Sequence, residues 1–597
     1  MPPDGRLRQS QMVTTFGPGA MYDLLDHAVL IGGLDFWSPP GGGAPVHEPR
    51  LRDKVADVMR ELKHPPLSVD QPFRKPPAGD EQNPNEGCGV QAYEFPRWFV
   101  CQNPRCRALS RAEHLEPKGN HRIHACGGAE QKHERCVPVR FVVTCTRGHL
   151  NDIDWPYWVH HEGRCDAPRL RLDEGATGDF SEVAVTCLTC NQRRRLIDLT
   201  VKDKTPKCSG ERPWLGKEGW EKCDEHQRLL TRTASNGYFA QVMSALSIPE
   251  PESLRRKIQA VWKFVEVATD VAQVAMIRQM YPQVKTACDT STDAEVLEAI
   301  VAQRENRSES KLDLREAEFQ KLIEQPFEQP GELPPPELSV QFWARRVAMS
   351  LPGVERLVLA RRLREVQVQI GFTRLEPKAT DTEGDILDLG VELAPLSLQR
   401  DWLPAVEING EGVFLRLDDA ALAAWEKRPA VVERGKQLLA GFEGWKKRVQ
   451  SKLAFPGIRY YLLHSLSHAL LTAMSLDCGY PASSIHERVY CGKYGAGLML
   501  STGTSGAEGT LGGLVEEGRR MKSHFARAFR DALLCSNDPV CAQHDPQGPT
   551  DRQLEGAACH GCLFVPECSC EKFNQFLDRA LVFPTLGLED AAFFSKL

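Results

Sequence analysis

Apolar residues recur at helical spacing along much of the chain after residue 250. One stripe with a period of about 3.6 residues lies in a region from 250 to about 325 that we expect to be helical. The residues of this stripe are Leu254, Ile258, Val261, Phe264, Val265 and Ala268. Similar patterns predict helices over 309–325, 337–366, 430–452, 458–476 and 513–535.

Shorter apolar runs have the length and composition of strands. Met12–Phe16 is predicted as a short strand that leads into a Gly-Pro-Gly turn. Phe141–Val143 and Val183–Val185 each run straight towards a cysteine, as strands do when they deliver metal ligands. Further strands are predicted at Val366–Ile370, Gly412–Leu417, Arg488–Tyr490 and Leu498–Leu500.

Breaks rich in proline and glycine, at 39–43, 76–77 and 326–336, divide the 597 residues into parts. The predicted parts are an N-terminal segment (1–85), a cysteine-rich zinc-binding region (86–245), a helical domain (250–330), a mixed helix and strand region (337–455) and a C-terminal four-cysteine domain (456–597). We therefore expect a mixed α+β, multi-domain protein. Zinc-ribbon-like modules would occupy the N-terminal half and helices the middle, and a cysteine cluster would close an α/β C-terminal domain.

Cysteine changes this picture most, because most of the 20 cysteines fall into clusters with metal-ligand spacing. Two thiolates two residues apart can bind one face of a tetrahedral zinc ion, and a second pair completes the shell. We expect three zinc-binding groups. They are Cys187, Cys190, Cys208 and Cys223; Cys101, Cys106, Cys126 and Cys136; and Cys535, Cys541, Cys559 and Cys562.

Disulfides are the alternative use of these thiols, and they require an oxidising compartment. Residues 1–11 are polar and charged and lack an apolar core, so they do not resemble a secretory signal. No stretch approaches the roughly 18 uncharged apolar residues of a membrane span. We therefore expect a cytoplasmic protein without a membrane partner, in which reduced thiols bind zinc.

Further residues could bind metal, and the sequence leaves their roles open. Cys145 and His149 could supply two ligands, with Cys165 as a third, or they could form a turn with a buried histidine. His464 and His468 stand four residues apart on an apolar helix and share one face. They could hold a metal or simply pack in the core, because no carboxylate or cysteine is adjacent in sequence. A metal-dependent nuclease or hydrolase centred on this pair is the alternative function.

Charge favours local rather than general contact with nucleic acid. The hydrophobic and charged fractions, 41% and 26%, are ordinary for globular proteins, and the net charge is −6. An acidic balance argues against a protein that coats nucleic acid along its whole surface. One basic run, Arg193, Arg194 and Arg195, follows Cys190 closely, where a rigid knuckle could present it to phosphates. These three arginines are the predicted DNA contacts.

The search for catalytic motifs argues against an enzyme. The nearest match to a phosphate-binding loop, Gly210–Lys217, has five residues between its glycines, and Glu218 follows the lysine. A carboxylate at that position would repel a nucleotide. No His-Glu-x-x-His motif occurs among the 17 histidines. We predict no catalytic residue.

Several short motifs are spread from one end of the chain to the other. They are Arg8–Gln11, Phe16–Gly19, Val137–Cys145, Gly148-His149, Asp152–Trp155, Thr233–Asn236, Glu508–Gly513, Gly556–Cys562 and Cys570–Asn574. Together they resemble the DrmB family, a subunit of the bacterial DISARM anti-phage system. The last two also resemble the four-cysteine domain of unknown function at the C-termini of certain DEAD/H-box helicases. The family pattern has a polar residue before Cys570, so the additional Cys568 leaves the fourth or spare ligand open.

This resemblance implies a function through partners. Members of the family work beside a larger helicase-like ATPase, DrmA, and the pair engages invading DNA before other components act. The resemblance therefore implies a non-catalytic, zinc-containing protein that forms a heterodimer with a DrmA-like subunit. It would stabilise that motor and contribute to a DNA path.

Overall fold

The computed structural model describes residues 7–596 of the chain, apart from short gaps. The gaps are 25–26, 63–66, 68–70, 79–88, 120, 127–132, 161–162, 164, 176–178, 202–204, 250–256, 259–260, 290, 305–312, 336–339, 378–391, 400, 450, 505–512 and 549–551. Leu254 of the predicted helical stripe and most of the motif Glu508–Gly513 therefore lie outside the described residues. Within those residues, no helix combines the length and the apolar character needed to cross a bilayer.

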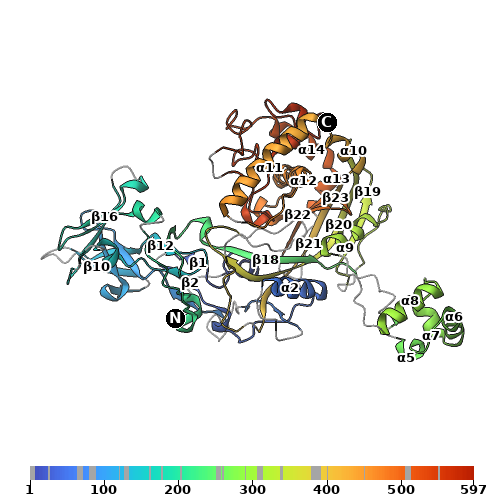
Figure 1. The fold of residues 1–597 in the computed structure, drawn as a ribbon, viewed down its shortest axis with the longest axis horizontal. Helices are drawn as coiled ribbons and strands as arrows, with labels where there is room; N and C mark the ends of the chain where they lie inside the picture. The colour runs from blue at the N-terminus through green and yellow to red at the C-terminus, as the bar shows by residue number, and fades with distance from the viewer. Residues whose placement is uncertain are drawn as a thin grey trace.

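A seven-stranded sheet forms the centre of the protein (Figure 1). Its strands are β18 (Phe239–Leu246), β20 (Val354–Thr373), β21 (Leu403–Leu417), β23 (Gly495–Thr504) and β22 (Ile485–Gly492) in this order, with β19 (Trp343–Val347) beside β20 and β4 (Phe73–Arg74) beside β21. β4 runs parallel to its neighbour, and the other pairs are antiparallel. β18 and β19 follow one another along the same edge of β20, where Leu246 pairs with Glu365 and Trp343 with Arg362.

β19 and β20 show that the helix predicted over 337–366 is wrong. β20 pairs along both edges, with β18 and β19 on one side and β21 on the other. The misassigned part is β19 and the first half of β20, where Leu357–Ala360 are consecutive buried apolar residues. Periodicity alone cannot tell such a short run from part of a buried helix. The strands predicted at Val366–Ile370 and Gly412–Leu417 are confirmed.

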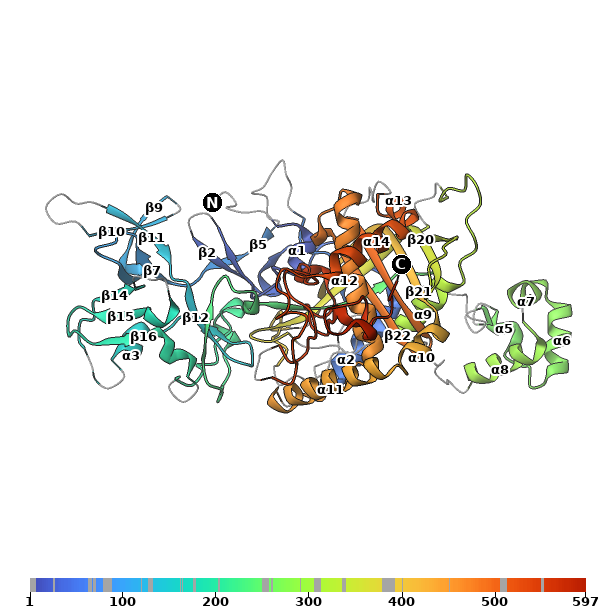
Figure 2. The ribbon, with the colours of Figure 1, turned by 90° about the horizontal axis from the view of Figure 1, so that it is seen from above.

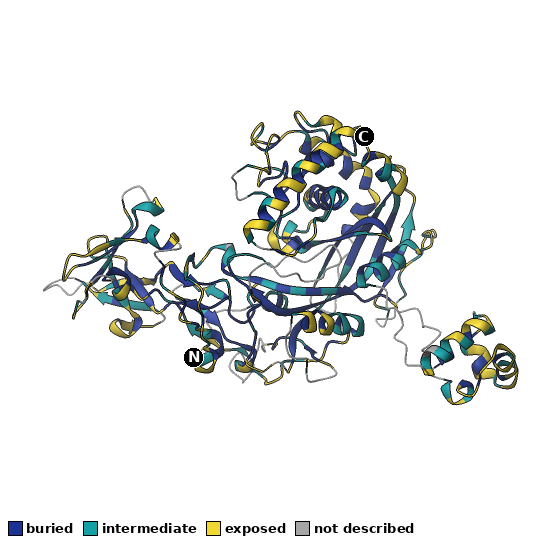
Figure 3. Cartoon of the chain, in the orientation of Figure 1, coloured by how far each residue is buried: buried dark blue, intermediate teal, exposed yellow. Residues whose placement is uncertain are grey.

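Five helices form the C-terminal lobe with β22 and β23 (Figure 1). They are α10 (Asp419–Trp425), α11 (Pro429–Val449), α12 (Ile458–Cys478), α13 (Gly513–Arg519) and α14 (Met521–Leu533). α12 runs through the middle of the lobe, is buried along most of its length (Figure 3) and packs against β22, β23, α13 and α14. Each fully buried leucine stabilises the fold by about 1.5–3 kcal/mol. The helices predicted over 430–452 and 458–476 are confirmed, and the one over 513–535 is divided at Arg520.

The central sheet crosses the predicted domain boundaries. It takes β4 from the predicted N-terminal segment, β18 from the cysteine-rich region, β19 to β21 from the mixed region, and β22 and β23 from the C-terminal part. Hydrogen-bonded strands of one sheet share their cores, so these parts do not fold independently of one another. The expected mixed α+β class is confirmed, whereas the middle of the chain contains more strand than predicted.

The cysteine-rich region contains a second, eight-stranded sheet at one end of the molecule (Figures 1 and 2). Its order is β16 (Arg193–Arg195), β15 (Ala184–Cys187), β14 (Leu170–Asp173), β8 (Ala108–Arg111), β7 (Trp98–Cys101), β11 (His133–Pro138), β10 (His121–Ala125) and β9 (Glu116–Lys118). A separate three-stranded sheet contains β13 (Leu150–Asn151), β12 (Phe141–Thr144) and β17 (Arg228–Thr231). The helix α3 (Trp155–Val159) packs against β15 and β16.

The N-terminal residues join this region to the central sheet. They form α1 (Gln9–Thr14), α2 (Pro49–Glu61), the sheet of β1 (Met21–Asp23), β2 (Ala28–Ile31) and β6 (Ala92–Glu94), and the pair β3 (Trp37–Ser38) and β5 (Gly89–Val90). The strand predicted at Met12–Phe16 is wrong, because α1 occupies most of this stretch. The side chain of Gln11 caps the helix by accepting a hydrogen bond of 3.0 Å from the amide of Arg8.

In the part of the chain that the structure describes, four short helices form a module with its own core at the other end of the molecule (Figures 1 and 2). They are α5 (Trp262–Val265), α6 (Val271–Met280), α7 (Pro282–Ala287) and α8 (Asp293–Arg304). Ile258, Val261 and Val265 of the predicted stripe are buried in this core. The next helix, α9 (Leu314–Ile323), packs instead against β22 and β20 of the central sheet.

Candidate metal centres

Four groups of cysteine and histidine side chains come together in the described residues. In each group the four ligand atoms lie within 4.8 Å of one another, so one metal ion could contact them all. We name these groups clusters A to D. Cluster A is Cys101, Cys106, His124 and Cys126; cluster B is Cys145, His149, Cys208 and Cys223; cluster C is His160, Cys165, Cys187 and Cys190; and cluster D is Cys535, Cys541, Cys559 and Cys562.

The structure divides one predicted group between two clusters. Cys187 and Cys190 belong to cluster C, whereas Cys208 and Cys223 belong to cluster B. The strand pairing explains this, because β15 delivers Cys187 from the eight-stranded sheet, while β12 and β17 flank cluster B in a separate sheet. The prediction that these four cysteines share one site is therefore wrong.

Cluster C joins a strand hairpin to the end of a short helix. β15 ends at Cys187, and the turn towards β16 presents Cys190. His160 follows α3, with Nδ1 2.7 Å from the carbonyl oxygen of Pro156 and Nε2 3.3 Å from Cys190 Sγ. A histidine that donates one ring N–H to a carbonyl can offer its other nitrogen to a metal. Cys165 Sγ, 3.9 Å from Cys187 Sγ, completes the group.

A glycine turn builds one half of cluster B. Cys145 directly follows β12, and Gly148 has a φ of 74°, a left-handed conformation that favours glycine. This turn returns His149 Nδ1 to within 3.3 Å of Cys145 Sγ. The other ring nitrogen, Nε2, lies 3.0 Å from a carboxylate oxygen of Glu221. The geometry of this approach is not that of a hydrogen bond, so the carboxylate contributes negative charge beside the ring.

Two facing loops supply the other half of cluster B. An isolated bridge between Lys207 and His226 holds the loops together, and the amide of Cys208 donates to the carbonyl of Glu225 at 2.8 Å. Cys208 and Cys223 are both buried beside the turn described above. The sequence left open whether Cys145 and His149 supply metal ligands. In the structure they face Cys208 and Cys223, and these four residues form one cluster. Cys165, the third ligand considered for them, belongs to cluster C instead.

Two thiols in clusters B and C are set up to ionise. Burial raises the pKa of Cys187, but hydrogen bonds from the backbone of Cys190 and Thr189 outweigh it, and the pKa falls to about 6. A hydrogen bond from Cys208 lowers the pKa of Cys145 to about 4. The thiolate is the form that binds metal, so Cys145 and Cys187 are held in their ligand state. The hydrogen bond to Cys145 instead raises the pKa of Cys208, and burial raises the pKa of Cys223 and of Cys165.

Cluster A contains a histidine that the sequence analysis missed. Cys101 Sγ lies 3.8 Å from Cys126 Sγ, and Cys106 Sγ lies 3.5 Å from His124 Nδ1. Cys136, the fourth predicted ligand, pairs with Cys101 across β7 and β11 and is buried beside the cluster. Burial raises the pKa of Cys136 and also that of Cys101, so the pKa does not separate these two thiols. His124 stands two residues before Cys126 in the sequence, and this spacing could have indicated that it is a ligand.

Cluster D brings together the four cysteines predicted at the C-terminal end. Cys535 Sγ lies 3.4 Å from Cys559 Sγ, and Cys562 Sγ lies 3.8 Å from both Cys541 and Cys559. The amide of Gly561 donates to Cys559 Sγ at 3.3 Å. Such amide donors stabilise thiolate charge. Burial raises the pKa of Cys559, but hydrogen bonds led by the Asn537 side chain lower it to about 7.

A buried arginine complements the charge of cluster D. Arg579 is fully buried, donates to the carbonyl of Ala532 at 2.8 Å and pairs with Asp538. Its positive charge interacts with the sulfurs of Cys541 and Cys562. Four thiolates around a divalent ion leave a net charge of about −2, so a buried cation nearby is favourable.

The three predicted DNA-contacting arginines differ in their surroundings. Arg194 is half-buried, and its guanidinium lies 3.3 Å from the centre of the Trp158 ring. It also donates to the Trp158 carbonyl at 3.0 Å, which ties this side chain to packing rather than to phosphate. Arg193 is exposed and lies 3.4 Å from Asp173, and Arg195 is exposed. We therefore retain Arg193 and Arg195 as predicted contacts and assign Arg194 a structural role.

The separation of clusters B and C predicts independent metal loss. Cys187→Ser and Cys208→Ser should each release about one metal equivalent, and the double variant about two, because each cluster binds its own ion. Elemental analysis of the purified full chain measures this. Cys288→Ala, in the core of the helical module, is the control and should keep the full content. A double variant that loses a single equivalent would return the four cysteines to one site.

Two family models match separate parts of the chain. A family described as "MrfA Zn-binding domain" matches residues 466–563, which contain all of cluster D. A family described as "Domain of unknown function (DUF8724)" matches residues 8–239, which contain clusters A to C. The DISARM protein DrmB of Bacillus paralicheniformis is 30% identical over 563 residues, covering 88% of this chain and 93% of that protein.

One solved structure is also similar, over a smaller part of the chain. The crystal structure of the DUF1998 helicase MrfA bound to DNA matches 35% of this chain and 23% of that chain at 13% identity. The TM-score is 0.18, and this likeness carries no argument about shape or activity.

Proposed function

Because the chain belongs to the DrmB family of DISARM proteins, we propose that it is a non-catalytic, zinc-containing partner of a helicase-like ATPase in anti-phage defence. The similarity to DrmB over nearly the full length of both proteins carries this proposal. The protein would act in the cytoplasm, stabilise the motor in a heterodimer and contribute to DNA engagement.

The donor sets of clusters A to D support zinc as the metal. Clusters A, B and C each offer three cysteines and one histidine, and cluster D offers four cysteines. These sets are those of tetrahedral structural zinc sites. Other soft ions can bind thiolates, but zinc has no redox chemistry and prefers this geometry. The match of cluster D to a family described as zinc-binding agrees with this choice.

The number of protein ligands supports a structural rather than a catalytic role. A catalytic zinc site keeps one position open for water or substrate, whereas a structural site is closed by four protein ligands. Each of clusters A to D offers four such ligands. A metal-dependent nuclease would need an open coordination position, and we therefore favour the role of a partner.

The direct test is reconstitution with the motor of the same defence system. The full chain, co-expressed with that helicase-like ATPase, should elute with it as a complex of one copy each. The full chain alone should hydrolyse neither ATP nor DNA. Two results would overturn the proposal: separate elution at micromolar concentrations, or DNA cleavage by the purified chain that a chelator abolishes and zinc restores.

Contact with DNA through β16 predicts a change in salt dependence. In the complex with the motor, Arg193→Ala with Arg195→Ala should weaken DNA binding. It should also flatten the plot of log K against log salt by about one unit per lost phosphate contact. Binding measured at several salt concentrations gives the slope. The matched control removes two exposed arginines elsewhere, Arg60→Ala with Arg530→Ala, and should leave the slope unchanged. An unaltered slope in the β16 variant would place the DNA path on another surface.

A further inference from the structure

A fifth group of ligands lies inside the C-terminal lobe, away from clusters A to D. We name it cluster E: His464 and His468 of α12, Glu487 of β22, and Cys570 after the turn η9 (Glu567–Ser569). Their four ligand atoms lie within 4.8 Å of one another. The exposed fractions are 0% for both histidines, 4% for the glutamate and 7% for the cysteine. Four polar groups have thus been removed from water around one point.

The short distances in cluster E converge on both imidazole rings. His464 Nε2 lies 2.8 Å from Glu487 Oε1 and 3.2 Å from Cys570 Sγ. His468 Nε2 lies 3.3 Å from the same oxygen of Glu487. The ring centroids of the two histidines are 4.6 Å apart. Two nitrogens, one oxygen and one sulfur therefore face a common centre.

The other nitrogen of each ring is already engaged. His468 Nδ1 lies 2.8 Å from the carbonyl oxygen of Leu563, and His464 Nδ1 lies 3.3 Å from that of Phe576. A carbonyl can only accept, so Nδ1 carries a proton in both rings. Nε2 of each ring then faces the carboxylate and the sulfur either as the donor of a second proton or as a lone pair that shares a cation with them. A ring held at Nδ1 by a carbonyl, with Nε2 directed at further ligand atoms, is the arrangement of metal-ligating histidines.

The oxygen and sulfur ligands are also held by surrounding donors. Glu487 accepts from Ser467 Oγ through one carboxylate oxygen and from the amide of Glu571, at 3.1 Å, through the other. Cys570 Sγ accepts from the amides of Lys572 and Asn574, at 3.3 and 3.2 Å. Amide donors that wrap a sulfur in a tight turn stabilise its thiolate. A backbone amide, that of Gly561, also donates to Cys559 Sγ of cluster D.

We propose that cluster E is a further metal site, which binds a zinc-like divalent ion through His464, His468, Glu487 and Cys570. Two neutral imidazoles, one carboxylate, one thiolate and a divalent cation sum to no net charge. A neutral assembly is the one that burial penalises least. Two nitrogen, one oxygen and one sulfur ligand suit a tetrahedral zinc ion.

The proposed ion joins three parts of the chain that are distant in sequence. His464 is 106 residues from Cys570, and His468 is 19 residues from Glu487. The four protein ligands close the shell, so the ion acts as a structural link between α12, β22 and the chain after η9. The family match at 466–563 includes His468 and Glu487 but neither His464 nor Cys570, so it does not cover the complete site.

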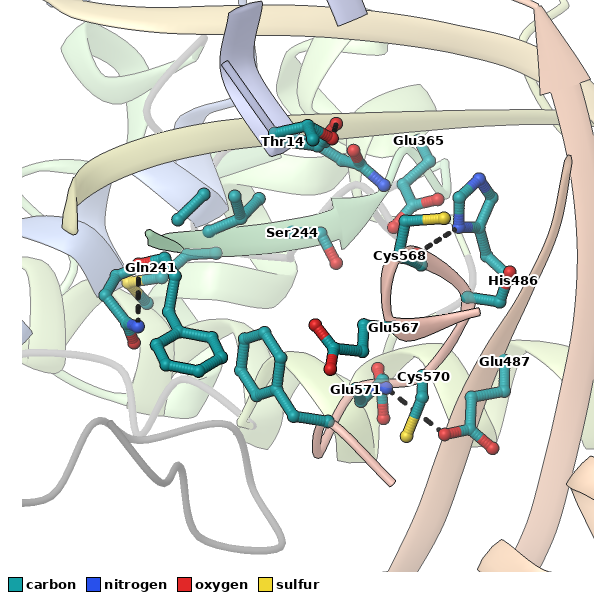
Figure 4. A pocket seen from close by; sticks show the side chains of 18 of the residues that line it. Thr14, Gln241, Ser244, Glu365, His486, Glu487, Glu567, Cys568, Cys570 and Glu571 are labelled. Carbon is teal, nitrogen blue, oxygen red and sulfur yellow. Dashed lines mark hydrogen bonds between the residues drawn. The ribbon is translucent and has the colours of Figure 1, made fainter. Parts of the chain in front are cut away.

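Cluster E also forms part of the wall of a cavity of about 250 Å³ (Figure 4). Glu487 and Cys570 lie side by side there, beside Glu571. The carboxylate of Glu571 pairs with Arg315 of α9 and accepts from the amide of Val489 at 3.2 Å. The ion would thus hold the segment that carries Glu571 against α9 and β22.

Metal content of the full chain tests the proposal. Cys570→Ser and His464→Gln should each lower the content by about one equivalent, because each removes a ligand of one ion. Cys568→Ser is the matched control, since Cys568 is exposed two residues away and its sulfur lies 3.7 Å from the carbonyl oxygen of Ser483. The control should keep the wild-type content. A soluble Cys570→Ser chain with full metal content would overturn the proposal.

Anomalous diffraction from crystals of the wild-type chain, recorded at the zinc absorption edge, gives a second test that needs no variant. A peak between the two Nε2 atoms, Glu487 Oε1 and Cys570 Sγ is the expected result. Peaks at clusters A to D without one at cluster E would overturn this inference and leave the proposed function intact. A map without any zinc peak would overturn both.

Discussion

Replacing Cys559 by serine should release about one equivalent of metal and open the segment from 534 to about 565 to proteolysis. The described residues after Leu533 contain no α-helix or strand, and only the 3₁₀ turns η9, η10 (Arg579–Leu581) and η11 (Glu589–Ala591). Cluster D is therefore the main local constraint on this segment. In zinc-finger peptides, the apparent binding free energy of a closed zinc site is on the order of 10–16 kcal/mol and is available for folding.

Limited proteolysis followed by mass spectrometry, together with elemental analysis, measures this effect. Cys568→Ser is again the control, because it removes an exposed thiol outside cluster D and should give the wild-type pattern. Treatment of the wild-type chain with a strong chelator should reproduce the cleavage of the Cys559→Ser variant. Wild-type cleavage and metal content in that variant would contradict a structural role for cluster D.

Removing the carboxylate of Glu318 should destabilise the central sheet by about 3–5 kcal/mol. Glu318 of α9 is fully buried and accepts two hydrogen bonds of 2.7 Å from Arg488 of β22. It also accepts from the hydroxyl of Tyr490 at 3.2 Å and from the amide of Leu246 at 2.9 Å. Glu318→Ala would leave the buried guanidinium of Arg488 without its main counter-charge.

Hydrogen exchange of peptides from β18 and β22 in increasing urea reports the free energy of opening of this sheet. Glu316→Ala on the same helix, at a half-buried position, should change it by less than about 0.5 kcal/mol. Arg488→Ala should cost as much as Glu318→Ala, and the double variant should cost less than the sum, because the two groups form one unit. Additive losses would show that the pair is not coupled.

The sequence predicted the helices of the C-terminal lobe because their ends are marked locally. α11 begins at Pro429, and α12 lies between Gly457 and Gly479. These residues are common helix boundaries, and their effect does not depend on the rest of the fold. Pro352 and Gly353 come directly before β20 and predicted a break there, but such a break can separate two helices as well as precede a strand. The state of β20 depends on strands β18, β19 and β21, which come from other parts of the chain, so periodicity misassigned its first half.

The metal ligands, like the strands, were predictable only where they lie close together in sequence. The pairs Cys187-x-x-Cys190 and Cys559-x-x-Cys562 were recognisable because one turn places both sulfurs on one side. The other two ligands of cluster C, His160 and Cys165, were not recognisable. The pairing of the strands decides which loop lies beside Cys187 and Cys190. His160 is a ligand candidate of cluster C because α3 packs against β15 and β16, a contact that spacing does not encode. Cluster D was predictable because it lies within one short stretch.

The collinear placement of β18 and β19 on one edge of β20 has a consequence for how this architecture can vary. The chain leaves that edge at Leu246 and returns at Trp343, opposite positions only three residues apart, Glu365 and Arg362. At about 3.3 Å per residue, the two ends of this excursion are about 10 Å apart. A connection of a few residues could span that distance, so the register of the seven-stranded sheet does not require the helical module α5 to α8, whereas α9 on the same excursion packs against the sheet.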